Sequence, residues 1–106
     1  MIEYYKLIRD RIPEIIERSG KKCVVEVLED DAYLQYLDQK LNEELAEYQE
    51  SKSMEELADL LEVMSAVAAA RGSSLDEVER IRLGKKEKRG GFEKKILLET
   101  VIDQEN

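Results

Sequence analysis

Apolar residues recur at helical spacing over two neighbouring stretches, residues 32–50 and 54–70. At about 100° per residue, five side chains of the first stretch fall within an arc of about 80°: Leu34, Leu37, Leu41, Leu45 and Tyr48. The second stretch has a broader apolar face, made of Leu57, Leu60, Leu61, Val63, Met64, Val67 and Ala68. Because only the tight turn Ser51-Lys52-Ser53 separates the two stretches, we expect an antiparallel helical hairpin.

Polar residues mark where these helices begin. Asp30 or Asp31 can cap the first helix, and Ser53 can cap the second. Ser74 opens another capping box, which predicts a further helix over residues 75–89. The apolar side of that helix is thin.

The remaining elements that the sequence predicts are short. Pro13 suits the first turn of a helix, so residues 13–18 are expected to be a short helix. Residues 21–28 are rich in valine, but one run of this length cannot form a sheet alone, and we expect an extended connector that packs on the helices. Residues 94–102 are again apolar and are expected to pack back as a strand-like or short helical tail. Residues 103–106 are expected to be disordered.

These elements predict an all-α fold, a helical bundle built around the antiparallel helix pair. The 106 residues suit a single domain over residues 1–106. A chain of this length buries a modest core, so the bundle should be more stable as an oligomer than alone.

Acidic side chains lie close to the apolar faces of both central helices. Glu44 lies about 60° from the centre of the first apolar arc and Glu47 about 120° from it, while Glu56 falls within the second apolar face and Asp59 at its edge. Carboxylates beside a core repel one another and resist desolvation, and a bound divalent cation would relieve both effects. Two other interpretations remain open: an acidic surface in a chain that is 40% charged, and a capping box from Ser53 to Glu56.

Composition narrows the chemistry further. The net charge is −8, which disfavours binding to nucleic acid. No apolar run reaches transmembrane length and no signal peptide is apparent, and the single Cys23 fits a cytoplasmic location. We expect Cys23 to be a buried small apolar residue and not a nucleophile. Because the chain has no histidine, an oxygen-rich site should prefer Mg²⁺ or Mn²⁺ over zinc.

Basic residues gather at the end of the 75–89 stretch, just before Gly90-Gly91-Phe92. They include Lys85, Lys86 and Arg89. Such side chains and exposed backbone amides can hold phosphate oxygens. Equally, cations are favoured in the last turn of any helix by its dipole.

The acidic motifs resemble a known signature. Lys40-Leu-x-Glu43-Glu44-x-x-Glu47, followed by Glu56-Leu-Ala-Asp59-Leu-Leu-Glu-Val, is similar to the signature of the all-α nucleoside triphosphate pyrophosphohydrolases, which include MazG, dimeric dUTPases and phosphoribosyl-ATP pyrophosphohydrolase. Two flanking motifs resemble the small MazG-like, phosphoribosyl-ATP pyrophosphohydrolase-like branch: Tyr5-Lys-Leu-Ile-Arg-Asp-Arg-Ile-Pro-Glu-Ile-Ile and Lys88-Arg-Gly-Gly-Phe. Eight residues separate Glu47 from Glu56, a shorter gap than is common in that superfamily.

The resemblance implies a role for each candidate residue. The Mg²⁺ ligands would be Glu44, Glu47, Glu56 and Asp59. Glu43 and Lys40 would bind or orient water and phosphate, and Glu43 or Glu47 would take the proton of the attacking water. The remaining cations would contact the triphosphate, namely Lys6, Arg9, Lys85, Lys86 and Arg89.

The implied activity is Mg²⁺-dependent hydrolysis of a nucleoside triphosphate between its α- and β-phosphates, which yields a monophosphate and pyrophosphate. The role could be house-cleaning of unwanted nucleotides. The resemblance also implies a core completed across a homodimer or a dimer of dimers. The alternatives are a non-catalytic helical dimer that binds nucleotides or a protein partner, and a metal-free acidic interaction module.

Overall fold

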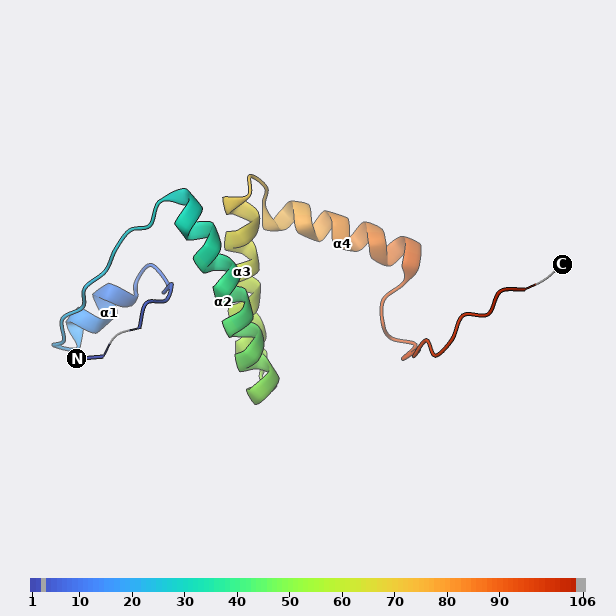
Figure 1. Ribbon diagram of the computed structural model, residues 1–106, viewed down its shortest axis with the longest axis horizontal. Helices are drawn as coiled ribbons and strands as arrows, with labels where there is room; N and C mark the ends of the chain where they lie inside the picture. The colour runs from blue at the N-terminus through green and yellow to red at the C-terminus, as the bar shows by residue number, and fades with distance from the viewer. Residues whose placement is uncertain (3, 105–106) are drawn as a thin grey trace. The chain divides into compact units, whose positions relative to one another are not determined.

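The computed structural model describes residues 1–2 and 4–104. Over these residues it contains four α-helices and no β-strand (Figure 1), which are α1 (Ile12–Arg18), α2 (Asp30–Ser51), α3 (Met54–Ala70) and α4 (Leu75–Arg89). The predicted all-α class is therefore confirmed. The bounds of α3 and α4 match the expected ones residue for residue, and α2 extends the expected stretch at both ends.

A short turn makes α2 and α3 antiparallel neighbours. Lys52 has a left-handed backbone conformation with φ 57°, and its N–H donates to the carbonyl oxygen of Tyr48 at 2.7 Å, which ends α2. The Ser53 hydroxyl then accepts a hydrogen bond from the N–H of Glu56 at 3.3 Å, which begins α3 as predicted. The two helices consequently lie side by side and pack against each other (Figure 1).

At the other end of the pair, the start of α2 differs from the prediction. Asp30 and Asp31 do not cap α2: Glu29 occupies the cap position without a side-chain hydrogen bond, and the two aspartates lie in the first turn. In the first turn, their negative charges stabilise the helix by interacting with the positive end of its dipole. At the end of α3, Gly72 adopts φ +83°, and the N–H of Ser73 donates to the carbonyl of Ala68 at 2.8 Å.

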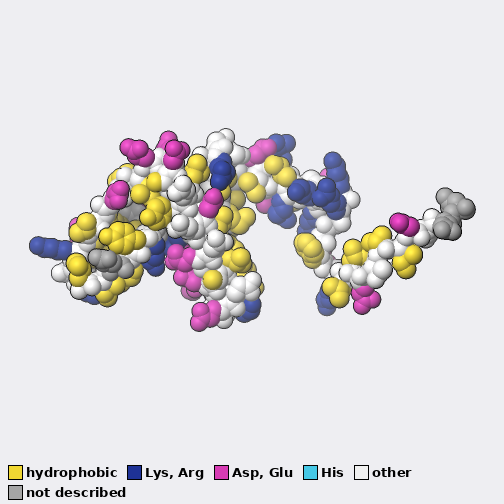
Figure 2. Space-filling model, in the orientation of Figure 1, with side chains coloured by type: hydrophobic (Ala, Val, Ile, Leu, Met, Phe, Trp, Pro, Cys, Tyr) yellow, Lys and Arg dark blue, Asp and Glu magenta, His cyan; other side chains and the backbone are white. Residues whose placement is uncertain are grey.

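The core between α2 and α3 is small. Among the described residues, the buried apolar side chains are Leu37, Val63 and Ala68. Large apolar side chains on the same pair stay exposed, and Figure 2 displays hydrophobic atoms on the surface of this pair: Leu45, Met54, Leu57, Leu61 and Met64. No helix of the described residues is long and apolar enough to cross a membrane.

The chain divides into two compact units, Met1–Leu75 and Asp76–Asn106, so its organisation as one domain stays a prediction. In the second unit, residues 94–102 form neither helix nor strand, and their apolar side chains are exposed. The expected strand-like or helical tail is therefore wrong. Residues 103–104 are exposed and irregular, whereas residues 105–106 of the expected tail lie outside the described residues.

Two features of the first unit remain. Residues 21–28 form no helix or strand, as expected for a connector. Val24 and Val27 are almost fully exposed, however, so the expected packing on the helices is limited to the half-buried Cys23 and Leu28. The Cys23 thiol lies 4.0 Å from the carbonyl oxygen of Pro13. Cys23 is thus only half-buried and not the fully buried residue that its apolar neighbours predicted.

Candidate metal centre

Three carboxylates from the two central helices converge near the α2–α3 turn. One oxygen each of Glu44, Glu56 and Asp59 lies within 4.8 Å of the others. Glu44 projects from α2, and the other two project from consecutive turns of α3. The two-residue connection between the helices places both acidic motifs at the same end of the hairpin, as the sequence predicted. We refer to these three side chains as the acid cluster.

The acid cluster is partly removed from water. Glu44 is only 7% exposed, and Glu56 and Asp59 are half-buried. The Oε2 atoms of Glu44 and Glu56 are buried and have no hydrogen-bond partner. A buried acceptor without a partner is rare in native proteins, and it destabilises the fold more when it is charged. Two such oxygens within one cluster make it a candidate site for a donor or a cation.

The electrostatics of the cluster point the same way. Burial raises the pKa of the Glu44 carboxyl, and Glu47 raises it further through a side-chain hydrogen bond and its negative charge, while Lys40 opposes the shift. Burial also raises the pKa of Glu56, followed by the charges of Glu47 and Asp59. Both side chains are thus acids held near other acids. A divalent cation would compensate that excess of negative charge.

Glu47 borders the acid cluster without belonging to it. Its side chain is exposed, and it is not one of the three carboxylates that converge within 4.8 Å. Its charge nevertheless acts on both Glu44 and Glu56. The structure therefore brings together three of the four predicted ligands and leaves the fourth at the solvent side.

The capping interpretation of Glu56 accounts for only part of that residue. Its backbone N–H donates to the Ser53 hydroxyl, which is one of the two bonds of a capping box, but the Ser53 N–H donates to Ser51 Oγ and not to the Glu56 carboxylate. Its carboxylate oxygen Oε2 is buried and has no hydrogen-bond partner. Capping thus explains why α3 begins at Met54, but it does not explain why this side chain faces Glu44 and Asp59.

Three of the predicted phosphate-binding cations lie at the edge of the cluster. Lys40 Nζ is 3.1 Å from Glu43 Oε1 and 3.5 Å from Glu44 Oε1. From the N-terminal segment, Lys6 Nζ lies 3.5 Å from the same Glu43 oxygen. Arg9 forms a closer pair, with its guanidinium 2.7 Å from Asp59 Oδ1.

The other three predicted cations lie in α4, within the second unit. Lys85, Lys86 and Arg89 are all exposed, and Lys86 Nζ is 3.7 Å from Glu93 Oε1. Figure 2 shows lysines and arginines gathered over α4. Hydrophobic side chains are exposed along the segment that follows it. Membership of these cations in a site with the acid cluster stays a prediction.

The chemistry of the donor set fits a hard cation. All three converging side chains offer carboxylate oxygens, and no imidazole or thiolate lies among them. Oxygen donors of this kind suit Mg²⁺ and Mn²⁺. The buried oxygens of Glu44 and Glu56 would gain in such an ion the partner that the protein itself does not provide.

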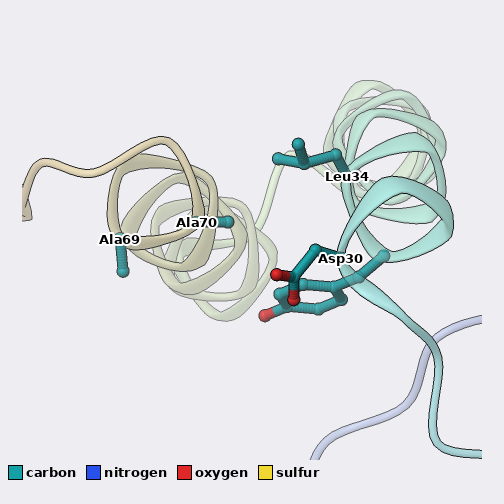
Figure 3. Close-up of a pocket in the computed structure, with 5 residues that line it drawn as sticks. Asp30, Leu34, Ala69 and Ala70 are labelled. Atoms are coloured by element: carbon teal, nitrogen blue, oxygen red, sulfur yellow. The ribbon is translucent and has the colours of Figure 1, made fainter.

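A shallow pocket lies at the other end of the same helix pair, between the start of α2 and the end of α3 (Figure 3). It encloses about 300 Å³ and is lined by Asp30, Tyr33, Leu34, Ala69 and Ala70. Asp30 and Glu44 are fourteen residues apart on one helix, so this pocket is about 20 Å from the acid cluster. It contributes nothing to the candidate metal centre.

The sequence did not reveal how the candidates pair. Every charged side chain at the centre was already a candidate, but the contact of Arg9 with Asp59 joins residues 50 positions apart. The acidic pairs had a visible signal in their helical spacing. The cations of the N-terminal segment had none, because an irregular segment has no periodicity from which to infer a face.

Comparison with known proteins adds little about function. One relative is a Mycolicibacterium smegmatis protein that is 55% identical over 42 residues and is described only as uncharacterized. The match covers 40% of this chain and 43% of the relative, so the chain spans less than half of that protein's length. No protein-family model matches the chain, and no solved structure does.

Proposed function

We propose that this chain is a Mg²⁺-dependent nucleoside triphosphate pyrophosphohydrolase of the all-α, MazG-like kind. It would cleave between the α- and β-phosphates to release a nucleoside monophosphate and pyrophosphate. The observation that carries the proposal is the acid cluster, in which Glu44, Glu56 and Asp59 converge and two buried oxygens have no partner.

The surroundings of the cluster favour a phosphate substrate. Arg9 and Lys40 contact members of the acid cluster, and Lys6 contacts Glu43 beside it. Lysine and arginine are the usual partners of phosphate oxygens, and a protein with net charge −8 needs local cations to hold a triphosphate. Carboxylates that hold a divalent ion, with basic side chains beside them, form an arrangement suited to an anhydride of phosphoric acid.

Each residue then has a distinct task. When bound, Mg²⁺ neutralises the phosphate oxygens and makes the phosphorus more electrophilic. Glu44, Glu56 and Asp59 hold the ion. Lys6 and Lys40 both contact Glu43, whereas Glu47 is exposed and adjoins two ligands of the ion. Glu47 is thus better placed than Glu43 to accept the proton of an attacking water.

The protein would act as a homodimer, or as a dimer of dimers, in the cytoplasm. The small core and the exposed apolar side chains of α3 support association, since a monomer would leave that surface in water. The same surface favours a second candidate function, a non-catalytic helical dimer that binds nucleotides or a protein partner. In that case the acid cluster would be retained without turnover.

Pyrophosphate release tests the proposal directly. The purified chain is incubated with a panel of canonical, deoxy, oxidised and otherwise modified nucleoside triphosphates, with Mg²⁺ or with EDTA. We expect at least one nucleotide to yield pyrophosphate and monophosphate in equal amounts, and only with the metal present. If a folded protein turns over no nucleotide on the panel, the enzymatic proposal is wrong and the non-catalytic dimer is favoured.

A further inference from the structure

Two cations of the N-terminal segment reach across both central helices. Lys6 contacts Glu43 of α2, and Arg9 contacts Asp59 of α3. Residues 4–9 form no helix or strand. The carbonyl of Arg9 accepts a hydrogen bond from the Ile12 N–H at 3.0 Å, which ties the backbone to the start of α1 but leaves the side chain of Arg9 free to rotate. Arg9 thereby occupies one oxygen of a carboxylate that the candidate metal centre needs.

We propose that Arg9 is an internal counter-ion of Asp59, which a divalent cation displaces, and that the released guanidinium then holds a phosphate oxygen of the substrate. The inference rests on the proposed function, because it assigns a second partner to Arg9 within the same site. It orders the binding events: the metal ion frees the arginine, and the arginine then strengthens binding of the phosphate.

The geometry favours exchange over a permanent pair. The Arg9 side chain is 59% exposed and the Asp59 side chain 41% exposed, and ion pairs that are open to water contribute little net stability. A guanidinium and a divalent ion on the same carboxylate would also repel each other. A divalent cation can therefore replace Arg9 at Asp59 at small cost.

Lys40 provides the contrast. It projects from α2 itself and contacts Glu43 and Glu44, three and four residues further along the same helix. Its side chain is 16% exposed, much less than that of Arg9. Lys40 thus belongs to the rigid part of the site and remains beside the acids in both states, whereas Lys6 and Arg9 belong to a segment that can shift.

The proposal predicts effects of opposite sign for the two ligands. Mn²⁺ binding to the full chain, without nucleotide, is measured by electron paramagnetic resonance for the wild type, Arg9→Gln and Arg18→Gln. Arg18 is exposed and pairs with Glu14 within α1, so its replacement controls for the lost positive charge. We expect Arg9→Gln to bind Mn²⁺ roughly two- to fivefold more tightly than Arg18→Gln, because the competing ion pair is gone.

Binding of inorganic tripolyphosphate in the presence of Mg²⁺ is then measured by calorimetry on the same three proteins. Here Arg9→Gln should bind about tenfold more weakly than Arg18→Gln, since a charge-assisted hydrogen bond is lost. Equal Mn²⁺ affinity in the two variants, or weaker binding by Arg9→Gln, would overturn the exchange. Equal tripolyphosphate affinity would do the same. If the wild type itself binds no Mn²⁺, the metal centre and the proposed function fail along with it.

Discussion

Glutamates meet opposite surroundings in α4 and in the α2–α3 pair. On α4, Glu77 lies 2.5 Å from the Arg80 guanidinium, and Glu79 lies 2.5 Å from that of Arg82. Hydrogen bonding to the arginine lowers the pKa of each carboxyl. These acids are exposed or half-exposed, and each has an arginine one turn away.

On the α2–α3 pair, glutamates have raised pKa values instead. Burial raises the pKa of Glu44 and Glu56, and neighbouring acids raise it further. Lys40 is the one basic residue among the main causes of the pKa shift at Glu44, and the main causes at Glu56 are burial and neighbouring acids.

The difference teaches that Glu77 and Glu79 find their arginine partners within α4, whereas the acid cluster is not neutralised within its own helices. A glutamate and an arginine spaced i,i+3 on one helix neutralise each other without a further ion. Lys40 of α2 offsets part of the negative charge at Glu44, and the rest of the cluster needs cations from outside the two helices. Arg9 supplies part of that charge at Asp59, and the buried oxygens of Glu44 and Glu56 remain without a partner.

The largest expected effect comes from removing one charge of the cluster. Glu44→Gln should lower the rate of pyrophosphate release by about a hundredfold or more, because the ion loses its most buried ligand. Glu79→Gln removes the same charge from α4 and should retain wild-type activity. Circular dichroism should record a folded protein in both cases, since Glu44→Gln also relieves repulsion. Similar activities of the two variants would remove the distinction between the two regions.

Mg²⁺ should stabilise the wild type by an intermediate amount. A ligand that binds only the folded state adds about 1.4 kcal/mol at ten times its dissociation constant, which raises the Tm by roughly 5–10 °C in a domain of this size. Differential scanning calorimetry with and without Mg²⁺ measures the shift. Glu44→Gln should lose most of it and Glu79→Gln should keep it. If millimolar Mg²⁺ and Mn²⁺ leave the Tm of the wild type unchanged, the metal-free acidic interaction module is favoured.

The smallest expected effect is the pH dependence of stability in the metal-free protein. The pKa values of Glu44 and Glu56 are raised above the ordinary 4.5, so above that pH the folded state binds more protons than the unfolded state. Their contribution to stability is complete below pH 4.5 and is lost as the pH rises through the folded-state pKa. Between pH 4.5 and 7, the Tm of the wild type should therefore fall relative to that of Glu44→Gln. Parallel curves for the two proteins would contradict the assignment of burial and repulsion to Glu44.

Much of the fold could be read from local pattern. The capping serine at Ser53 and the run of apolar residues fixed α3, and the short turn made α2 and α3 antiparallel. The pattern was wrong for residues 94–102, which are apolar but exposed and irregular. Apolar composition favours burial only where another surface is present to provide it, and the second unit offers just the thin apolar side of α4.

The residues of the candidate site could also be predicted in part. Helical spacing identified Glu44, Glu47, Glu56 and Asp59 as acids near the core, and the structure joins three of them in one cluster. Spacing placed Glu44 nearer the core than Glu47, but it also placed Glu56 within its apolar face, where the structure leaves it only half-buried like Asp59, because the depth of a side chain depends on the neighbouring helix. The buried position of Glu44 and the exposed position of Glu47 agree with their angles from the apolar arc, whereas the convergence of Glu44 with Glu56 and Asp59 is a consequence of how α2 meets α3.

The sequence by itself determined the helices, their antiparallel pairing and the lack of histidine and of an internal disulfide in these 106 residues, because these depend on residues close along the chain or on composition alone. Only the tertiary structure decided that Glu44 and Glu56 have buried oxygens without partners, and that Arg9 contacts Asp59. Both facts involve groups brought together from separate segments. Desolvation and Coulomb interactions depend on distance in space, which the order of residues does not specify.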